Sequence, residues 1–289
     1  AIDLPEQPSP VGTGMASPMA HLPSGTRFGT LVHAIFEDVD FRAPDLAAEV
    51  HGHCARLLTR MPLADVDATG LAEALLPSLL TPLGPLAGGR RLADISTTDR
   101  LPELDFDYPL TGGDTPSGRA TLGDVAALLT AHLPADDPLV EYPAMLADPL
   151  LAEESLRGYL TGSIDAVLRF TDDGGPRYAV VDYKTNWLGA PGTDLLVDHY
   201  HPRAMAEAMM RSHYPLQALL YQVGLHRFLR WRQPDYRPEI HLGGVLYLFV
   251  RGMAGPDTPS VDGVPHGVFS WRPPAELVRE LSDLIAGGL

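Results

Sequence analysis

The chain has 289 residues, a formal net charge of −16 and a single cysteine, Cys54. One cysteine excludes a disulfide framework, a Cys-rich zinc site and a four-cysteine iron–sulfur cluster. The acidic balance argues against a free-standing nucleic-acid-binding protein, because tight binding depends largely on neutralising phosphates. The single cysteine also indicates a reduced, cytoplasmic setting. No apolar run is long enough to span a bilayer and no signal peptide is visible, so no membrane partner is expected.

The first segment carries few structural signals. Residues 1–24 are rich in Pro, Gly and Ser and show no periodicity, which predicts a flexible interdomain linker. The sequence does not start with Met, so we expect a fragment of a longer protein. Residues 25–289 are expected to form the folded domain. No G-x-x-x-x-G-K-[ST] phosphate loop occurs, so no ATPase motor is expected in this segment.

Helices are predicted before the first strand. Residues 26–41 carry an apolar stripe at helical spacing, with His33 beside it. A histidine in that place is either a packed core residue or a ligand. Asp45 is the expected N-cap of a second helix that runs to Met61, and a third helix is expected over about 71–80.

An acidic strand is predicted over residues 101–110. Its apolar residues alternate with Glu103, Asp105 and Asp107, which therefore share one face. Such a face is usually solvated, although a metal site can recruit one of its members. Further along, the periodicity predicts four helices and a buried strand, namely helices over 121–133, 203–212, 214–231 and 275–286 and a strand over 241–250.

A β-hairpin stands at the centre of the functional prediction. Two extended segments, 159–170 and 177–185, flank the polar residues TDDGG and predict two strands joined by a rather long loop. Alternate side chains of a strand lie on one face, so Asp182 and Lys184 are expected to project together. Asp165 on the partner strand can reach the same face.

The composition draws attention to Lys184. The chain contains 21 Lys and Arg residues, and Lys184 is the only lysine among them. Lysine changes its protonation when its surroundings change, whereas arginine stays protonated. Two carboxylates with the backbone carbonyl of Tyr183 between them suit Mg²⁺ or Mn²⁺. The same spacing also fits an ordinary Asp–Lys surface pair in a hairpin, and the spacing leaves both interpretations open.

Five short motifs follow one another along the chain. They are G-T-x-V-H on a helix, an acidic strand, G-x-I-D, V-D-Y-K-T-N and Q-x-x-x-Y on a helix. In this order they resemble the PD-(D/E)xK nuclease superfamily and, more narrowly, the C-terminal nuclease domains of RecB subunits. The resemblance spans residues 27–253. It implies a restriction-endonuclease-like α/β fold, in which a central mixed β-sheet is flanked by helices and the helices over 45–61 and 71–80 are an insertion.

The resemblance also implies metal ligands and a catalytic amine. His33, Asp165, Asp182 and the carbonyl of Tyr183 are expected to bind a catalytic Mg²⁺, for which Mn²⁺ can substitute. Lys184 is expected to orient or deprotonate the attacking water.

Three further residues match positions of the family pattern. Glu103 falls where the family has an acidic residue before the hairpin, and it is expected to assist with a metal. Gln217 and Tyr221 match the Q-x-x-x-Y pair near the scissile DNA; the residues themselves also fit the polar edge of a core-facing helical stripe. Arg227, Arg230 and Arg232 surround Trp231 in the densest basic and aromatic cluster of the chain, which fits either phosphate binding or an exposed helix end.

The function implied is a Mg²⁺-dependent DNA nuclease domain. It would hydrolyse DNA unwound by a helicase complex, mainly at single-stranded ends, in double-strand break repair and DNA end degradation. RecC-like and RecD-like subunits and the helicase part of its own chain are the implied partners. An inactive nuclease-like scaffold and a stand-alone hydrolase of small phosphoesters are the alternatives. Asp165, Asp182 and Lys184 are all present, which favours an active domain.

Overall fold

The computed structural model describes residues 14–110, 120–172 and 174–287. At its centre lies a five-stranded mixed sheet with the strand order β1-β2-β3-β4-β7. Its strands are β1 (Arg100–Pro109), β2 (Tyr159–Asp172), β3 (Gly175–Lys184), β4 (Leu242–Phe249) and β7 (Val268–Trp271). Strands β3 and β4 are parallel and the other neighbours are antiparallel. A separate two-stranded ribbon pairs β5 (Ser260–Val261) with β6 (Val264–Pro265).

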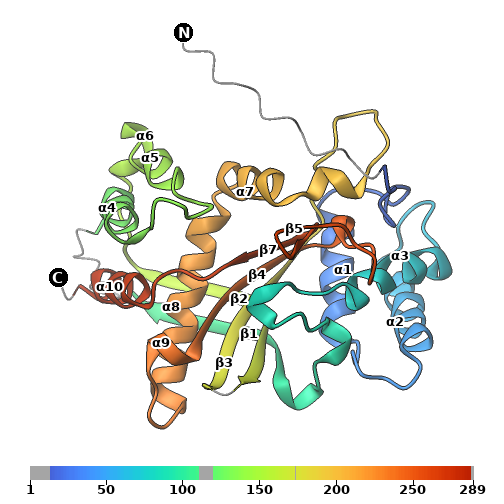
Figure 1. The fold of residues 1–289 in the computed structure, drawn as a ribbon, viewed down its shortest axis with the longest axis horizontal. Helices are drawn as coiled ribbons and strands as arrows, with labels where there is room; N and C mark the ends of the chain where they lie inside the picture. Colours follow the sequence, from blue (N-terminus) through green and yellow to red (C-terminus); the bar gives the residue numbers. More distant parts are fainter. Residues whose placement is uncertain (1–13, 111–119, 173, 288–289) are drawn as a thin grey trace.

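Helices cover both faces of the sheet (Figure 1). One face packs against α1 (Thr26–Asp38), α2 (Leu46–Arg60) and α3 (Ala68–Leu80). The other face packs against α8 (Tyr214–Arg232), with α4 (Leu122–His132), α7 (Pro202–Arg211) and α10 (Ala275–Ala286) beside it. Short α-helices are α5 (Tyr142–Leu146), α6 (Pro149–Ala152) and α9 (Pro238–His241), and 3-10 turns span Pro85–Ala87, Leu92–Asp94, Thr97–Asp99, Val197–Tyr200 and Val250–Gly252.

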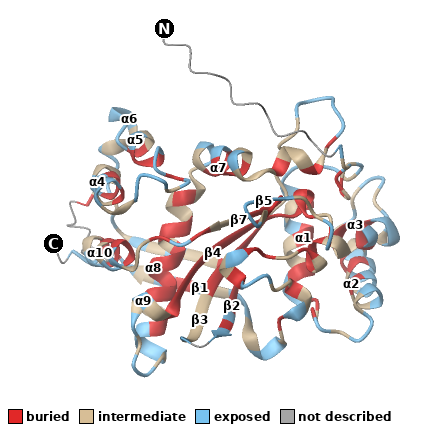
Figure 2. Ribbon diagram, in the orientation of Figure 1, coloured by how far each residue is buried: buried red, intermediate tan, exposed pale blue. Residues whose placement is uncertain are grey.

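Strand β4 separates two hydrophobic cores. Every residue from Leu242 to Phe249 is buried, and Figure 2 shows the strand buried along its length. Because side chains alternate across a strand, Leu246 and Leu248 pack on the α1–α3 side, whereas Val245 and Tyr247 pack on the α8 side. Burial on both faces is typical of strands that pair in parallel inside a layered α/β domain, where helices cover both sides of the sheet.

Most of the predicted elements are confirmed. The α/β class, the mixed sheet with its flanking helices and the four predicted strands are present, and α2 and α3 lie between α1 and β1 as expected. Asp45 caps α2 by accepting a hydrogen bond from the Ala48 N–H at 3.0 Å. In the described part of the chain, no helix is long and apolar enough to cross a membrane.

Two features of the sheet differ from the prediction. The β2–β3 pairing continues to Asp172 and Gly175, so the hairpin turn is shorter than the sequence indicated. Strand β7 was not expected, because four residues are too few to show a reliable alternation. Its position is fixed instead by pairing with β4, a contact between two segments that are not adjacent in the sequence.

The described part of the expected linker is folded onto the domain. Residues 1–13 lie outside the described residues, but residues 14–24 are placed. The Ser17 N–H donates to the Leu195 carbonyl at 2.8 Å, and Met19 is fully buried in the α1–α3 core. For residues 14–24 the structure therefore corrects the expectation of a flexible linker, because Met19 contributes apolar burial that composition alone did not reveal.

Close packing at Gly252 gives a first testable consequence. A Cβ at this position would lie 2.3 Å from the Tyr200 Cβ and 2.9 Å from the Gly267 Cα. We expect Gly252→Ala to lower the free energy of unfolding by about 1–3 kcal/mol, measured by urea denaturation, because the backbone must shift. Gly52→Ala in α2 is the matched control, since no atom would lie within 4 Å of its Cβ. That control should be stabilising by about 0.5–1 kcal/mol, and equal effects of the two changes would contradict the packing argument.

Candidate active site

The site is built around the carboxyl end of β3. Asp182 is 2% exposed, and its Oδ2 lies 2.7 Å from the Nζ of Lys184. Between them, the Tyr183 ring points to the opposite face and packs 4.8 Å from the ring of Phe36 in α1. The two-residue period of the strand thus joins Asp182 with Lys184, as the sequence predicted, and shows that their pair is a buried one.

Aromatic rings enclose the Lys184 amine. Its Nζ lies 4.0 Å from the ring centroid of Tyr214 and 5.2 Å from that of Tyr247. The amine also donates to the Oε1 of Gln217 at 3.3 Å, and the side chain is 12% exposed. Ring faces stabilise a cation by their quadrupoles, and the effect is larger where water is excluded. The amine therefore has a fixed position rather than a solvated one.

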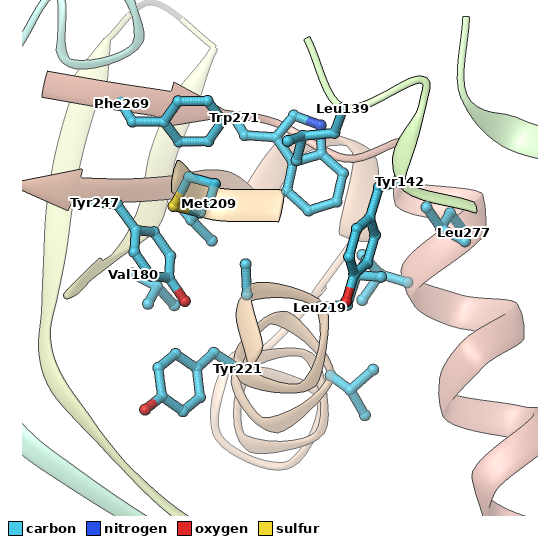
Figure 3. Close-up of a cluster of buried hydrophobic side chains, with 14 of the residues drawn as sticks. Leu139, Tyr142, Val180, Met209, Leu219, Tyr221, Tyr247, Phe269, Trp271 and Leu277 are labelled. Atoms are coloured by element: carbon cyan, nitrogen blue, oxygen red, sulfur yellow. The ribbon is translucent and has the colours of Figure 1, made fainter. Parts of the chain in front are cut away.

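A hydrogen-bond network fixes the orientation of Gln217. Its Nε2 donates to the hydroxyl of Tyr221 at 2.8 Å, and its Oε1 accepts from the hydroxyl of Tyr247 at 3.1 Å. Gln217 and Tyr221 stand one turn apart on α8, whereas Tyr247 comes from β4; Figure 3 shows both tyrosines in the cluster of buried side chains around α8. The amide oxygen is thus directed at Lys184, since its nitrogen is committed to Tyr221.

Asp165 and His33 meet at the point where β2 and β3 separate. The ladder between the two strands ends with the pair Ala166 and Val181. One residue further, Asp165 Oδ2 accepts from the Tyr183 N–H at 2.8 Å, and its Oδ1 lies 3.2 Å from His33 Nδ1. The predicted residues of α1, β2 and β3 are therefore brought together.

The ionisable groups of the site influence one another. Burial raises the pKa of Asp182 to about 6, and the charge of Asp165 raises it too, whereas Lys184 lowers it. Burial alone lowers the pKa of His33, but its hydrogen bond with Asp165 and the charges of both aspartates outweigh this and leave the pKa raised. Because the two carboxylates repel each other, a cation that binds between them is favoured.

The donor set fits a hard divalent cation. Asp182 Oδ2 is buried without a hydrogen bond of good geometry, although Lys184 provides a charge beside it. The carboxylate of Asp165 and the carbonyl of Tyr183 add oxygen donors, the type that Mg²⁺ prefers, and a His33 nitrogen suits Mn²⁺ better. Within the described residues, no three His, Cys, Asp or Glu side chains are already arranged as metal ligands. Asp182 is turned to Lys184, and Asp165 to His33 and Tyr183.

Glu103 contacts Glu37 in the structure, and whether it assists with a metal stays a prediction. It stands opposite Asp165 in the β1–β2 register, between the pairs of Pro102 and Leu104, but its φ of 46° turns the chain locally. Its carboxyl group instead lies against that of Glu37 in α1, and burial together with this contact raises the pKa of Glu37. In the described part of the chain, no hydrogen bond joins Glu103 to Asp165 or Asp182.

The three predicted DNA-binding arginines divide into two groups. Arg227 is used within the fold, because its Nε donates to the Ser282 hydroxyl at 3.0 Å and its Nη2 to the Ser282 carbonyl at 2.8 Å. Arg230 and Arg232 are exposed, and Arg232 lies over the ring of Trp231, which is 75% exposed. They are about 20 Å along α8 from Gln217, at about 1.5 Å per residue.

A cavity opens beside the Lys184 amine. Its volume is about 580 Å³, and its lining comes from the start of α1 and from the loop after β3 as well as from the site; the residues include Gly25, Thr26, His33, Lys184, Asn186, Trp187 and Tyr214. Sequence reasoning missed Tyr214 and Tyr247. A signal for Tyr247 was present, since it is the one polar side chain in the apolar stretch LGGVLYLF.

Comparison with known proteins places the chain in a family. No family model matches it. It is 53% identical over 284 residues to RecBCD enzyme subunit RecB of Mycolicibacterium smegmatis, an alignment that covers 98% of this chain and 26% of that protein. The chain belongs to the RecB family. The RecB subunit of Mycobacterium tuberculosis is 54% identical over 284 residues, with 96% of this chain and 25% of that protein covered.

A more distant RecB subunit matches nearly the same span. That of Escherichia coli is 32% identical over 270 residues, which covers 92% of this chain and 19% of that protein. The chain thus spans about a quarter or less of the length of these RecB relatives, and the similarity includes the segments that carry the site.

Proposed function

We propose that this chain is the nuclease domain of a RecB-like subunit and hydrolyses phosphodiester bonds of DNA with a bound Mg²⁺. The observation that carries the proposal is the buried pair of Asp182 and Lys184 at the end of β3, with Asp165 next to it. A PD-(D/E)xK site, which the motifs predict, requires two acidic residues and a lysine close together, and this geometry supports that assignment. Homology to RecB subunits, whose names assign them to RecBCD enzymes, agrees with it.

The residues divide the chemical work among themselves. Asp165 and Asp182 would hold Mg²⁺ or Mn²⁺, together with the Tyr183 carbonyl and His33. When bound, the ion supplies Lewis-acid activation of water and stabilises charge on the phosphoryl oxygens. Lys184 orients the attacking water or takes its proton, since its amine is held at a fixed place.

Gln217 and Tyr221 fix the position of the Lys184 amine. The Oε1 of Gln217 accepts a hydrogen bond from the Lys184 amine, and the Nε2 of Gln217 donates one to the Tyr221 hydroxyl. Their own positions are set by α8 and by the Tyr247 hydroxyl. Holding a catalytic amine in place before substrate arrives lowers the entropy cost of the reaction.

We further propose that the domain acts within a larger assembly. Its RecB relatives are named as subunits of RecBCD enzymes, and this chain corresponds to only a part of their length. RecC-like and RecD-like subunits and a helicase part of the same chain would deliver unwound DNA to the site, in double-strand break repair and end degradation. Single-stranded ends are the substrate that such delivery provides.

Metal removal tests the proposed reaction directly. We expect cleavage of a single-stranded oligonucleotide by the full chain to stop in excess chelator and to return with Mg²⁺ or Mn²⁺, because the two carboxylates need the ion to activate water. Gel analysis of the products measures this. Cleavage that continues in chelator would contradict the mechanism, and no cleavage with either ion, alone or in the assembled complex, would favour the inactive scaffold.

The acidic surface predicts weak binding of DNA by the isolated chain. The net charge of −16 repels a polyanion, and screening acts only beyond about 8 Å at physiological salt. Of the basic cluster, Arg227 is engaged with Ser282, which leaves Arg230 and Arg232. We expect at least about tenfold weaker binding by the chain than by the assembled complex, where tethering raises the local concentration of DNA.

Fluorescence anisotropy with labelled single-stranded and duplex DNA, at one salt concentration, measures this difference. The chain alone should also cut single-stranded ends better than duplex interiors. Equally tight binding by the isolated chain and the complex would show that the net charge does not govern recognition.

A further inference from the structure

Arg251 is a fully buried arginine that donates to backbone carbonyls. It lies in the 3-10 turn directly after β4 and is 0% exposed, and among the described residues no ion pair includes it. Its Nε donates to the Thr185 carbonyl at 2.9 Å. Its Nη1 donates to the carbonyls of Met19 at 2.8 Å and Leu22 at 3.3 Å, and its Nη2 donates to that of Pro23.

One of these carbonyls belongs to Thr185, which lines the cavity beside the site, and another belongs to Pro23, which directly precedes the lining residues Ser24 and Gly25. Thr185 directly follows Lys184 in the chain, so its position is tied to that of the amine. Pro23 precedes Ser24 and Gly25, where α1 begins, and α1 carries His33. The cavity of about 580 Å³ is lined by residues of both walls. One guanidinium therefore connects the loop after β3 with the entry to α1.

Stacking strengthens the same connection. The Arg251 guanidinium lies 4.8 Å from the ring centroid of Phe28 in α1 and 5.5 Å from that of Trp187 in the loop. The walls also touch directly, since a Cβ on Gly29 would lie 3.2 Å from the Thr185 Oγ1. A substitution of Arg251 would thus alter packing on both sides of the cavity.

The N-terminal segment also donates a hydrogen bond to the backbone of Arg251. The hydroxyl of Ser17 donates to the Arg251 carbonyl at 2.6 Å. Residues 15–24 are therefore held by both the side chain and the backbone of one residue. A buried charge is costly unless polar groups surround it, so the guanidinium needs these carbonyls in place. Detaching the segment would leave the charge without most of its partners, and the loop after Lys184 would lose its anchor.

We infer that Arg251 is a positioning residue, which sets the distance between Lys184 and His33 and makes the site depend on docking of residues 15–24. The inference rests on the proposed nuclease function. A displacement of residues 15–24 would therefore reach the catalytic amine through the Arg251 side chain. No contact between Arg251 and DNA is required.

Two substitutions in the full chain test the inference. Arg251→Met keeps the length of the side chain but removes every donor, and Arg251→Lys keeps the charge and part of the donors. We expect Arg251→Met to lower kcat by about tenfold to a hundredfold with KM changed much less, since misplacing a catalytic group by about 1 Å has effects of that size. Arg251→Lys should recover part of the loss. Rates are measured with Mg²⁺ and a single-stranded oligonucleotide and are divided by the folded fraction.

Hydrogen exchange supplies a second readout that needs no activity. In Arg251→Met, the amides of residues 15–24 and 185–189 should exchange faster together, while those of β1 stay unchanged. Arg272→Met is the matched control, because Arg272 also donates to two carbonyls, those of Leu242 and Glu239, away from the cavity. It should leave kcat and both segments as in the wild type.

The outcomes separate the two proposals. Absence of Mg²⁺-dependent cleavage in the wild-type chain would count against the nuclease function, and the exchange experiment would still decide the role of Arg251. Faster exchange in only one of the two segments would overturn the coupling. So would a normal kcat in folded Arg251→Met, or an equal effect of Arg272→Met.

Discussion

Replacing Asp182 by Ala should abolish metal-dependent cleavage while leaving the fold intact. The carboxylate is 2% exposed and supplies one of the two acidic side chains that would hold Mg²⁺. Losing several kcal/mol of charge stabilisation corresponds to about a thousandfold or more in rate. The fold should survive, because burial of this carboxyl is unfavourable enough to raise its pKa to about 6. The measurement is the initial rate of oligonucleotide cleavage at saturating Mg²⁺, with circular dichroism of the same preparation.

Asp105→Ala provides the matched control for that experiment. Asp105 is an exposed carboxylate on β1, so its removal changes the net charge equally without touching the site. It should cut at the wild-type rate and unfold within about 0.5 kcal/mol of the wild type. A wild-type rate in Asp182→Ala would refute the assignment of the site.

Lys184→Arg should also fail to support cleavage, although it preserves the positive charge. The amine sits 2.7 Å from Asp182 and 4.0 Å from the ring of Tyr214, and a planar guanidinium does not fit that space without moving them. Arginine also stays protonated near neutral pH and cannot take a proton from water. We expect a loss of about a hundredfold or more, the usual range for general acid–base catalysis.

The reciprocal exchange Arg203→Lys controls for the substitution itself. The Arg203 side chain is 78% exposed on α7, so lysine should serve equally well there. Near-full activity of Lys184→Arg would mean that Lys184 acts only as a positive charge. A lysine would then not be required at position 184 for proton transfer.

Local signals in the sequence predicted much of this structure. The helix predicted over 121–133 is α4, and it starts at a capping box in which the Asp124 N–H donates to the Thr121 hydroxyl at 3.2 Å. The pairing of Asp182 with Lys184 followed from strand alternation. Such features depend on residues within one turn or one strand, where spacing determines contact.

Features that depend on distant residues could not be read from spacing. The contact of His33 with Asp165 joins positions 132 apart, and only the family resemblance indicated it. The family pattern placed Glu103 by its position before the hairpin, but spacing could not indicate its positive φ or its contact with Glu37. Residues 14–24 are held by bonds to Leu195 and to Arg251, both far away in the sequence, and composition carries no trace of these bonds.

The enclosed amine at position 184 also makes the chain convenient for spectroscopy. With no other side-chain amine present, reductive methylation with isotopically labelled formaldehyde places a reporter group on this side chain and no other. The rings of Tyr214 and Tyr247, at 4.0 and 5.2 Å, would shift its magnetic resonance away from that of a free lysine. Beside the signal of the methylated terminal amine, the Lys184 signal would thus report the binding of metal or nucleotide without an engineered label.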